Sequence, residues 1–110
     1  IIDITEVEMK VSTKLTGNEL HIILDGELDH SVADRIREQI DECITNLRPT
    51  KVILEMNKLR FMDSTGIGLI LGRYKKLEKL SVPMYVTGTN KQVDKVFFTS
   101  GIYEIICKLA

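Results

Sequence analysis

The chain contains no apolar run that approaches the roughly 18 residues needed to span a bilayer. Its start lacks the charged region and the long apolar region of a secretory signal peptide. It also lacks an excess of charge, because 15 basic and 16 acidic residues are mixed along 110 positions and give a formal net charge of −1. We therefore expect a cytoplasmic protein that binds neither nucleic acid nor a membrane.

Cysteine is scarce, and its placement indicates no metal or redox site. Cys43 and Cys107 lack the close spacing of metal-binding or redox-active pairs. We expect two reduced thiols that behave as small apolar side chains, Cys43 buried in a helix and Cys107 in a strand. There is also no internal repeat, linker or low-complexity tract. With 44% hydrophobic and 28% charged residues, the composition is typical of one folded domain over residues 1–110.

Motifs for catalysis are missing as well. The sequence has neither a G-x-S-x-G nucleophile elbow nor a G-x-x-x-x-G-K-[ST] phosphate loop. His21 and His30 have no spacing that indicates a metal site or a catalytic triad. We therefore expect no enzyme activity, no catalytic residue, no cofactor and no metal.

Alternating and helical patterns follow one another along the chain. Residues 6–14 and 20–24 alternate apolar and polar side chains around a turn, which predicts a β-hairpin. The elements predicted after it are a helix at 32–47, a strand at 51–56, a loop at 57–60, a helix at 64–80, a strand at 84–87, a helix at 91–99, and an edge strand or helix start at 103–107. This order predicts an α/β fold, a mixed sheet of about four to five strands with helices packed against it.

Residues near the predicted helix ends are suited to capping. Asp29 or Ser31 can cap the helix at 32–47, and Asn90 can cap the helix at 91–99. Gly101 closes that last helix, since glycine readily adopts the left-handed conformation of a helix C-terminus.

The segment most informative about function is Phe-Met-Asp-Ser-Thr-Gly-Ile-Gly at residues 61–68. It places Ser64 at a helix N-terminus, where free backbone N–H groups and the helix dipole favour negative charge. Such a serine can cap the helix or carry a phosphate. More cap-competent residues are adjacent than one helix end requires, and Gly66 and Gly68 keep the surroundings open. A phosphate beside Asp63 would expel an acidic partner or break an apolar contact.

The spacing of residues in the predicted helix at 64–80 indicates a core face and a flat outer face. Its apolar side chains on the core face are expected at Ile67, Ile70, Leu71, Tyr74 and Leu77. The outer face is expected to hold Gly68 and Gly72, with Leu69 as an exposed apolar bump beside them. Each glycine costs about 1 kcal/mol relative to alanine within a helix. The pair indicates a docking face that a partner backbone can approach closely, unless one glycine packs against a neighbouring element.

Two segments carry a family resemblance. Residues 24–30, Leu-Asp-Gly-Glu-Leu-Asp-His, resemble the G-E-L-D loop of STAS domains. Residues 61–75 are similar to the D-S-[ST]-G-[LI]-G segment of bacterial anti-sigma factor antagonists, and the order of elements agrees over nearly the whole chain. The chain departs from many relatives in stopping soon after Leu109, where they carry a final helix. That departure would leave the far end of the sheet less covered or put an edge within reach of a partner.

The resemblance implies a partner switch in which Ser64 is the phosphoacceptor. The unphosphorylated form would bind an anti-sigma factor that is also a serine kinase, and so free a sigma factor. The kinase would phosphorylate Ser64 with ATP and dissociate, and a metal-dependent serine phosphatase of the PP2C type would reset the switch. Asp63 would orient the site, and the loop of Asp29 would border the docking face. The partner-binding residues expected are Asp29, Asp63, Thr65, Gly66, Gly68, Leu69 and Gly72.

Two other functions of the same fold stay open. One is a scaffold or interaction module of a larger signalling assembly. The other is a nucleotide-binding or anion-binding module that uses the helix N-terminus at Ser64 as its site.

Overall fold

Five strands form one mixed sheet whose spatial order is the order of the chain. In the computed structural model, which describes residues 9–110, β1 (Lys10–Thr16) pairs antiparallel with β2 (Glu19–Leu28). The remaining strands run parallel to β2 and are β3 (Lys51–Met62), β4 (Met84–Thr87) and β5 (Cys107–Leu109). The sheet confirms the predicted α/β fold and the predicted hairpin; residues 6–8 of that prediction lie outside the described residues.

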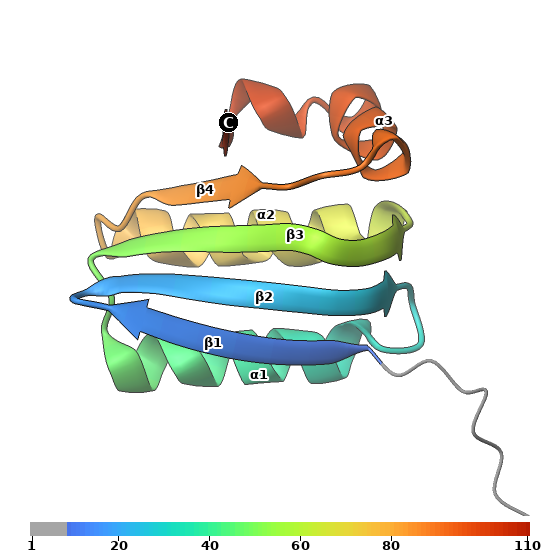
Figure 1. The fold of residues 1–110 in the computed structure, drawn as a ribbon. Helices are drawn as coiled ribbons and strands as arrows, with labels where there is room; N and C mark the ends of the chain where they lie inside the picture. Colours follow the sequence, from blue (N-terminus) through green and yellow to red (C-terminus); the bar gives the residue numbers. More distant parts are fainter. Residues whose placement is uncertain (1–8) are drawn as a thin grey trace, which may run out of the picture.

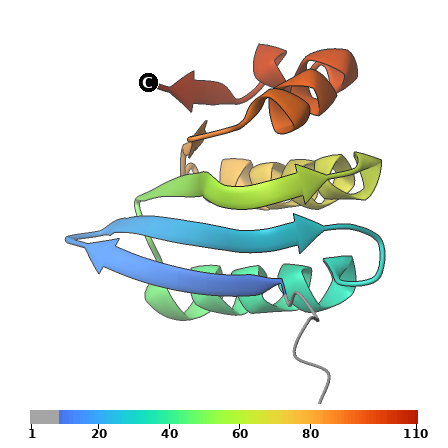
Figure 2. The ribbon, with the colours of Figure 1, turned by 45° about the vertical axis from the view of Figure 1, so that its right-hand side comes forward.

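Helices α1 (Ala33–Leu47) and α2 (Ser64–Lys79) lie side by side on one face of the sheet (Figure 1). Helix α3 (Lys91–Ser100) and the 3₁₀ turn η1 (Ile102–Glu104) lie toward the β4–β5 side, as the turned view also shows (Figure 2). Helices α1 and α2 each follow a parallel strand, so both begin at the edge of the sheet where β2 and β3 end. Ligand and partner sites of parallel sheets commonly lie at that edge.

The core lies between the sheet and its helices, with Val93 and Phe97 of α3 in the same cluster as the residues under α1 and α2. Alternate residues of β2 (Leu20, Ile22, Leu24 and Leu28) are fully buried, whereas the intervening His21 and Ile23 are only half-buried. Helix α1 adds Ala33, Ile36, Ile40 and Ile44 at three- and four-residue spacing. The apolar side chains that recur every second residue in the strand and every three to four residues in the helix therefore pack together in one layer, as the sequence predicts.

One predicted loop is wrong. Residues 57–60 continue β3, because Lys58 pairs with Asp25 and Leu59 with Gly26 in the parallel ladder. The register between β2 and β3 shifts on either side of these pairs. Such irregularities let a strand carry exposed polar residues that look like a loop in the sequence.

The predicted cap of α1 is also wrong, and one cysteine differs from expectation. Val32 is the N-cap of α1 and makes no side-chain hydrogen bond, while Asp29 Oδ1 accepts from the Ser31 backbone N–H and hydroxyl at 2.9 and 2.6 Å. Asp29 therefore closes a turn after β2, which extends to Leu28. Cys43 is half-buried rather than buried, Cys107 is exposed on β5, and both are free thiols.

Helix α3 begins and ends as predicted. Asn90 Oδ1 accepts from the Val93 backbone N–H at 2.9 Å, and Gly101 ends the helix with φ 78°. The sequence predicts either an edge strand or a helix start at residues 103–107. The structure has the 3₁₀ turn η1 followed by the strand β5 there.

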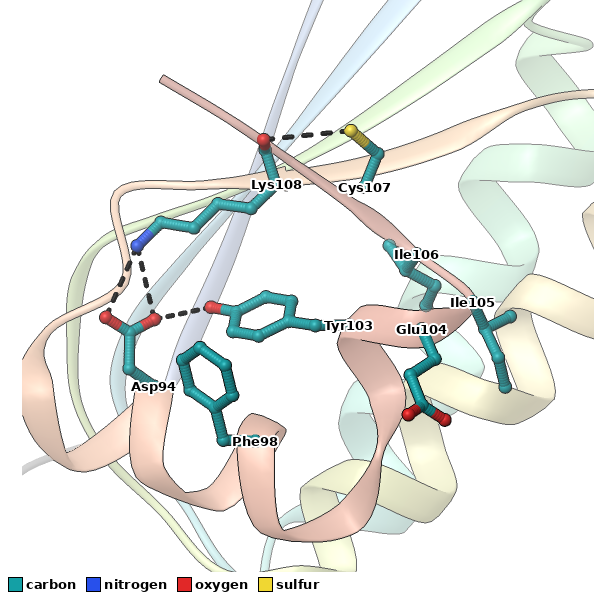
Figure 3. A pocket seen from close by; sticks show the side chains of 8 residues that line it. All are labelled: Asp94, Phe98, Tyr103, Glu104, Ile105, Ile106, Cys107 and Lys108. Atoms are coloured by element: carbon teal, nitrogen blue, oxygen red, sulfur yellow. Dashed lines mark hydrogen bonds and ion pairs between the residues drawn. The ribbon is translucent and has the colours of Figure 1, made fainter.

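A polar cluster fixes this last part of the chain, beside a hollow of about 470 Å³ (Figure 3). Asp94 accepts hydrogen bonds from the Thr89 hydroxyl at 2.6 Å, from the Tyr103 hydroxyl, and from Lys108 Nζ at 3.2 Å. Hydrogen bonds from Thr89 and then Tyr103 lower the pKa of Asp94. Burial, followed by the hydrogen bond to Asp94, raises the pKa of Tyr103 to about 12.

The raised pKa of Tyr103 predicts a loss of stability at alkaline pH. The folded protein holds the phenolic proton that the unfolded chain releases near the ordinary pKa of 10.0, so the free energy of unfolding should fall between about pH 10 and about pH 12. Urea unfolding followed by circular dichroism across this range measures the effect. The decline in the free energy of unfolding should be smaller in Tyr103→Phe than in wild type. In the control Tyr85→Phe it should be the same as in wild type. An equal decline in wild type and Tyr103→Phe would contradict the assignment.

Candidate functional site

The start of α2 is capped by Asp63 and leaves Ser64 free. Asp63 has an extended backbone, and its Oδ1 accepts from the Thr65 backbone N–H at 2.8 Å. Ser64 is therefore the first helical residue, its side chain is exposed, and no hydrogen bond to another residue of 9–110 engages its hydroxyl. Of the two roles that the sequence allows Ser64, capping is taken by its neighbour.

Backbone contacts hold this helix start firmly against the sheet. The Asp63 N–H donates to the carbonyl oxygen of Leu28 at 3.2 Å, which joins α2 to the end of β2. The side-chain amide of Gln92 donates to the Met62 carbonyl at 2.8 Å and accepts from the Met62 N–H at 3.0 Å. Asn90 Nδ2 donates to the Leu59 carbonyl at 3.1 Å. The chain that leads into Ser64 is thus fixed by β2 and by α3, which suits a site that has to keep its shape.

Sequence reasoning missed the role of Gln92. Its local setting, the first turn of a helix, is that of an ordinary exposed polar residue. Only the packing of α3 beside the end of β3 brings its amide to both backbone groups of Met62.

Gly66 is needed by the packing of α2. A Cβ atom on Gly66 would lie 2.4 Å from Met62 Cγ and 3.1 Å from Leu28 Cδ2, both of them inside normal contact distances. Gly66 is buried, so the expectation that it keeps the surroundings of Ser64 open is wrong. Its small size instead lets α2 lie close to the ends of β2 and β3.

Gly68 and Gly72 differ from Gly66, because nothing would meet a side chain at either position. A Cβ atom there would have no heavy atom within 4 Å among the described residues. Ser64, Gly68 and Gly72 follow one another at four-residue steps, so they lie along one side of α2. We call these three residues the glycine strip. The alternative that one of these two glycines packs against a neighbour is not met within residues 9–110. That this side of α2 is a docking face stays a prediction.

Leu69 is not the exposed bump that the sequence predicts. Its relative exposure is 6%, and it belongs to the buried face of α2 with Gly66, Ile70 and Leu77. Ile67, Leu71 and Tyr74, expected in the core, are half-buried. Gly66 and Leu69, three residues apart, both lie on the buried side of α2. Leu69 therefore supports the glycine strip from beneath.

A shallow groove runs between α1 and α2, and we call it the α1–α2 groove. Near Ser64 it has a hollow of about 240 Å³, and Thr65, Gly68, Asp34 and Arg37 are among its lining residues. Farther along, Arg73 Nε lies 2.8 Å from Asp41 Oδ1, an ion pair outside hydrogen-bond alignment. Burial lowers the pKa of Arg73, and Asp41 opposes that effect.

Asp29 lies one residue beyond the contact that joins β2 to the start of α2. That its loop borders a docking face, as the resemblance implies, stays a prediction. Asp29 directly follows Leu28, whose carbonyl oxygen accepts from the Asp63 N–H. The hydroxyl and then the backbone N–H of Ser31 lower the pKa of Asp29, which favours its charged form. Two carboxylates, Asp29 and Asp63, thus flank the approach to Ser64.

His21 lies apart from this site, and His30 follows Asp29 in the loop after β2. His21, on the sheet face turned away from α1 and α2, lies 2.7 Å from Glu19 and 2.5 Å from Glu55, and His30 is exposed. Residues 9–110 contain no group of three or more His, Cys, Asp or Glu side chains that could hold a metal ion. None of their helices combines the length and the apolar character needed to cross a membrane.

The family model of the STAS domain matches residues 10–110. The anti-sigma F factor antagonist of Paenibacillus polymyxa is 39% identical over 87 residues, which cover 79% of this chain and 74% of that protein. The chain belongs to the STAS domain family, among the anti-sigma factor antagonists.

Solved STAS structures agree with the fold. The anti-sigma factor antagonist SpoIIAA in its unphosphorylated form has 32% identity and a TM-score of 0.77, over 94% of this chain and 89% of that chain. The Bacillus cell fate determinant SpoIIAA in the phosphorylated form has 31% identity and a TM-score of 0.69, over 94% and 92%. The STAS resemblance of residues 24–30 and 61–75 is therefore confirmed at the level of the family and the fold.

The three glycines of α2 should respond in opposite ways to alanine. Gly66→Ala should lower the free energy of unfolding by about 1–3 kcal/mol, because its Cβ overlaps Met62. Gly68→Ala and Gly72→Ala should each raise it by up to about 1 kcal/mol, because alanine favours the helix and meets no neighbour. Urea unfolding of the purified variants measures all three. A loss of stability in Gly68→Ala would reveal a packing role for that glycine.

Proposed function

We propose that this STAS domain is an anti-sigma factor antagonist switched by phosphorylation of Ser64. In its unphosphorylated form it binds an anti-sigma factor and so frees a sigma factor; a phosphate on Ser64 releases that partner. The observation that carries the proposal is the exposed Ser64 hydroxyl at the start of α2, with the capping role taken by Asp63. Relatives named as anti-sigma factor antagonists, and SpoIIAA solved with and without phosphate, support it.

The charges around Ser64 favour a phosphate that repels a partner and leaves the fold of the domain intact. A phosphoserine adds a charge of about −1.5 to −2 at neutral pH. The positive end of the helix dipole at the start of α2 lowers its cost within the domain. Asp63 and Asp29 add negative charge nearby, so an acidic surface resting on Ser64 would be repelled.

The partner-binding surface that we propose centres on the glycine strip. Gly68 and Gly72 leave α2 bare beside Ser64, so a partner backbone can approach the helix closely. Thr65, at the near end of the α1–α2 groove, and Asp29 border this surface. Gly66 and Leu69 contribute from beneath, by keeping the helix close to the sheet.

The partner itself would be the kinase, and the exchange would take place in the cytoplasm. The oxygen of Ser64 attacks the γ-phosphorus of ATP bound to the partner, loses its proton, and ADP leaves. A PP2C-type serine phosphatase would hydrolyse the phosphoserine and restore binding. The antagonist supplies only an accessible hydroxyl on a fixed backbone, which matches the geometry of Ser64.

A free anion or a nucleotide fits the helix start less well. Asp63 already satisfies the N–H of Thr65 and places a carboxylate where an incoming anion would have to lie. The same negative charge that helps a covalent phosphate to repel a partner would weaken binding of a free one.

Substitutions of Ser64 should separate binding from phosphorylation. Ser64→Asp should weaken binding of the cognate anti-sigma factor by at least about tenfold, because it adds negative charge within the contact. Ser64→Ala should bind within about threefold of wild type and accept no phosphate. Calorimetry measures the affinities, and intact mass measures phosphate transfer from ATP. Phosphate on Ser64→Ala, with loss of transfer in the control Thr65→Ala, would move the acceptor to Thr65.

Filling the glycine strip should block binding without harming the fold. Gly68→Leu places a side chain where no heavy atom lies within 4 Å, so stability should hold while affinity for the anti-sigma factor falls at least about tenfold. Lys79→Leu, which introduces the same side chain at an exposed position farther along α2 and outside the glycine strip, is the control and should bind as wild type. Unchanged affinity in Gly68→Leu would remove the strip from the interface.

A further inference from the structure

A second hollow lies at the opposite end of the α1–α2 groove from Ser64. It has a volume of about 490 Å³ and forms where α1 and α2 end. Its lining residues include Ile44, Arg48, Pro49, Lys76, Leu80 and Val82.

The hollow combines an apolar floor with a cationic rim. Ile44 and Pro49 are buried at its base, whereas Leu80 is 59% exposed and presents a large apolar side chain to solvent. Arg48 is exposed and has no ion-pair partner among residues 9–110. Lys76 lies 3.6 Å from Asp41, a carboxylate that also pairs with Arg73. The rim therefore holds more positive charge than its own carboxylates neutralise.

This hollow lies in line with the glycine strip, on the same side of α2 as the surface proposed to bind the partner. Ser64, Gly68, Gly72 and Lys76 follow at four-residue steps, so Lys76 lies about 18 Å along α2 from Ser64. The hollow near Ser64 and this one are both walled by α1 and α2, with the Asp41–Arg73 pair between them. A partner lying along the glycine strip reaches both ends of the groove.

We propose that this hollow is a second contact for the anti-sigma factor, and that it takes an apolar side chain flanked by carboxylates. This inference rests on the function proposed above. The apolar floor and the exposed Leu80 match an apolar side chain, and Arg48 and Lys76 match the carboxylates beside it. An acidic partner surface also explains the sign of the switch, because it is attracted at this end of the groove and repelled by a phosphate at Ser64.

Neutral substitutions test the contact with the unphosphorylated protein and its cognate anti-sigma factor. Leu80→Gln should weaken binding by about tenfold, and so should the double variant Arg48→Gln/Lys76→Gln. The matched controls are Leu47→Gln, a leucine 39% exposed at the end of α1 that does not line this hollow, and Lys79→Gln on α2. Both controls should bind within about twofold of wild type. Thermal unfolding checks that every variant is folded.

The salt dependence of binding gives a second readout. Affinity of the wild type should fall as salt is added, and it should fall less steeply in Arg48→Gln/Lys76→Gln, because that variant has lost the paired charges. Leu80→Gln should keep the wild-type salt dependence.

The outcomes separate this inference from the proposed function. Wild-type affinity in all hollow variants, together with loss of binding in Ser64→Asp, would overturn the second contact and leave the switch at Ser64 standing. Equal weakening in Lys79→Gln and in the hollow variants would also overturn it, because only overall charge would matter. No binding by the unphosphorylated wild type would overturn both.

Discussion

The hydrogen bond from the Thr65 N–H to the Asp63 carboxylate is the interaction on which the site depends. A helix start needs a side-chain acceptor, and serine is among the best residues for that task. Because Asp63 fulfils it, the adjacent Ser64 hydroxyl has no structural duty and stays exposed. The backbone of Asp63 is itself bonded to Leu28, and Met62 before it is held by Gln92. The proposed phosphoacceptor is thereby held on a fixed backbone and is not used to cap the helix.

The glycines of α2 show how one residue type serves the fold and the surface within two turns. Gly66 is small because Met62 and Leu28 lie against it, whereas Gly68 and Gly72 have open space above them. Glycine inside a helix lowers stability, so Gly68 and Gly72 are a local weakness that packing does not require. Burial of Leu69, Ile70 and Leu77 offsets this weakness by anchoring the helix to the sheet. Because packing against the sheet stabilises one side of α2, the other side can lack side chains at Gly68 and Gly72.

Local patterns in the sequence predicted the features that depend on neighbours in the chain. Alternation gave the hairpin, helical spacing gave α1 and α2, and the Asp63–Ser64 pair marked the helix start. The errors fall where tertiary packing decides. Residues 57–60 join β3 only because β2 pairs with them after a register shift, and Leu69 is buried because the packing of α2 on the sheet covers the side that carries Gly66 and Leu69. Gln92 could not be assigned from its surroundings in the sequence, since its partner is Met62, thirty positions earlier.

The same geometry bears on how a single phosphate can act as a switch. Reversing a binding equilibrium almost completely requires about 5.5 kcal/mol of difference between the two states. Like charges brought together in a contact cost several kcal/mol, and removing a dianion from water adds to that cost. Both effects arise at Ser64 itself, because the hydroxyl lies at the surface where a partner would rest. The backbone around it, tied to β2 and α3, has no need to move. A rigid domain is therefore sufficient for the switch, since the phosphate changes the surface that the partner meets rather than the fold beneath it.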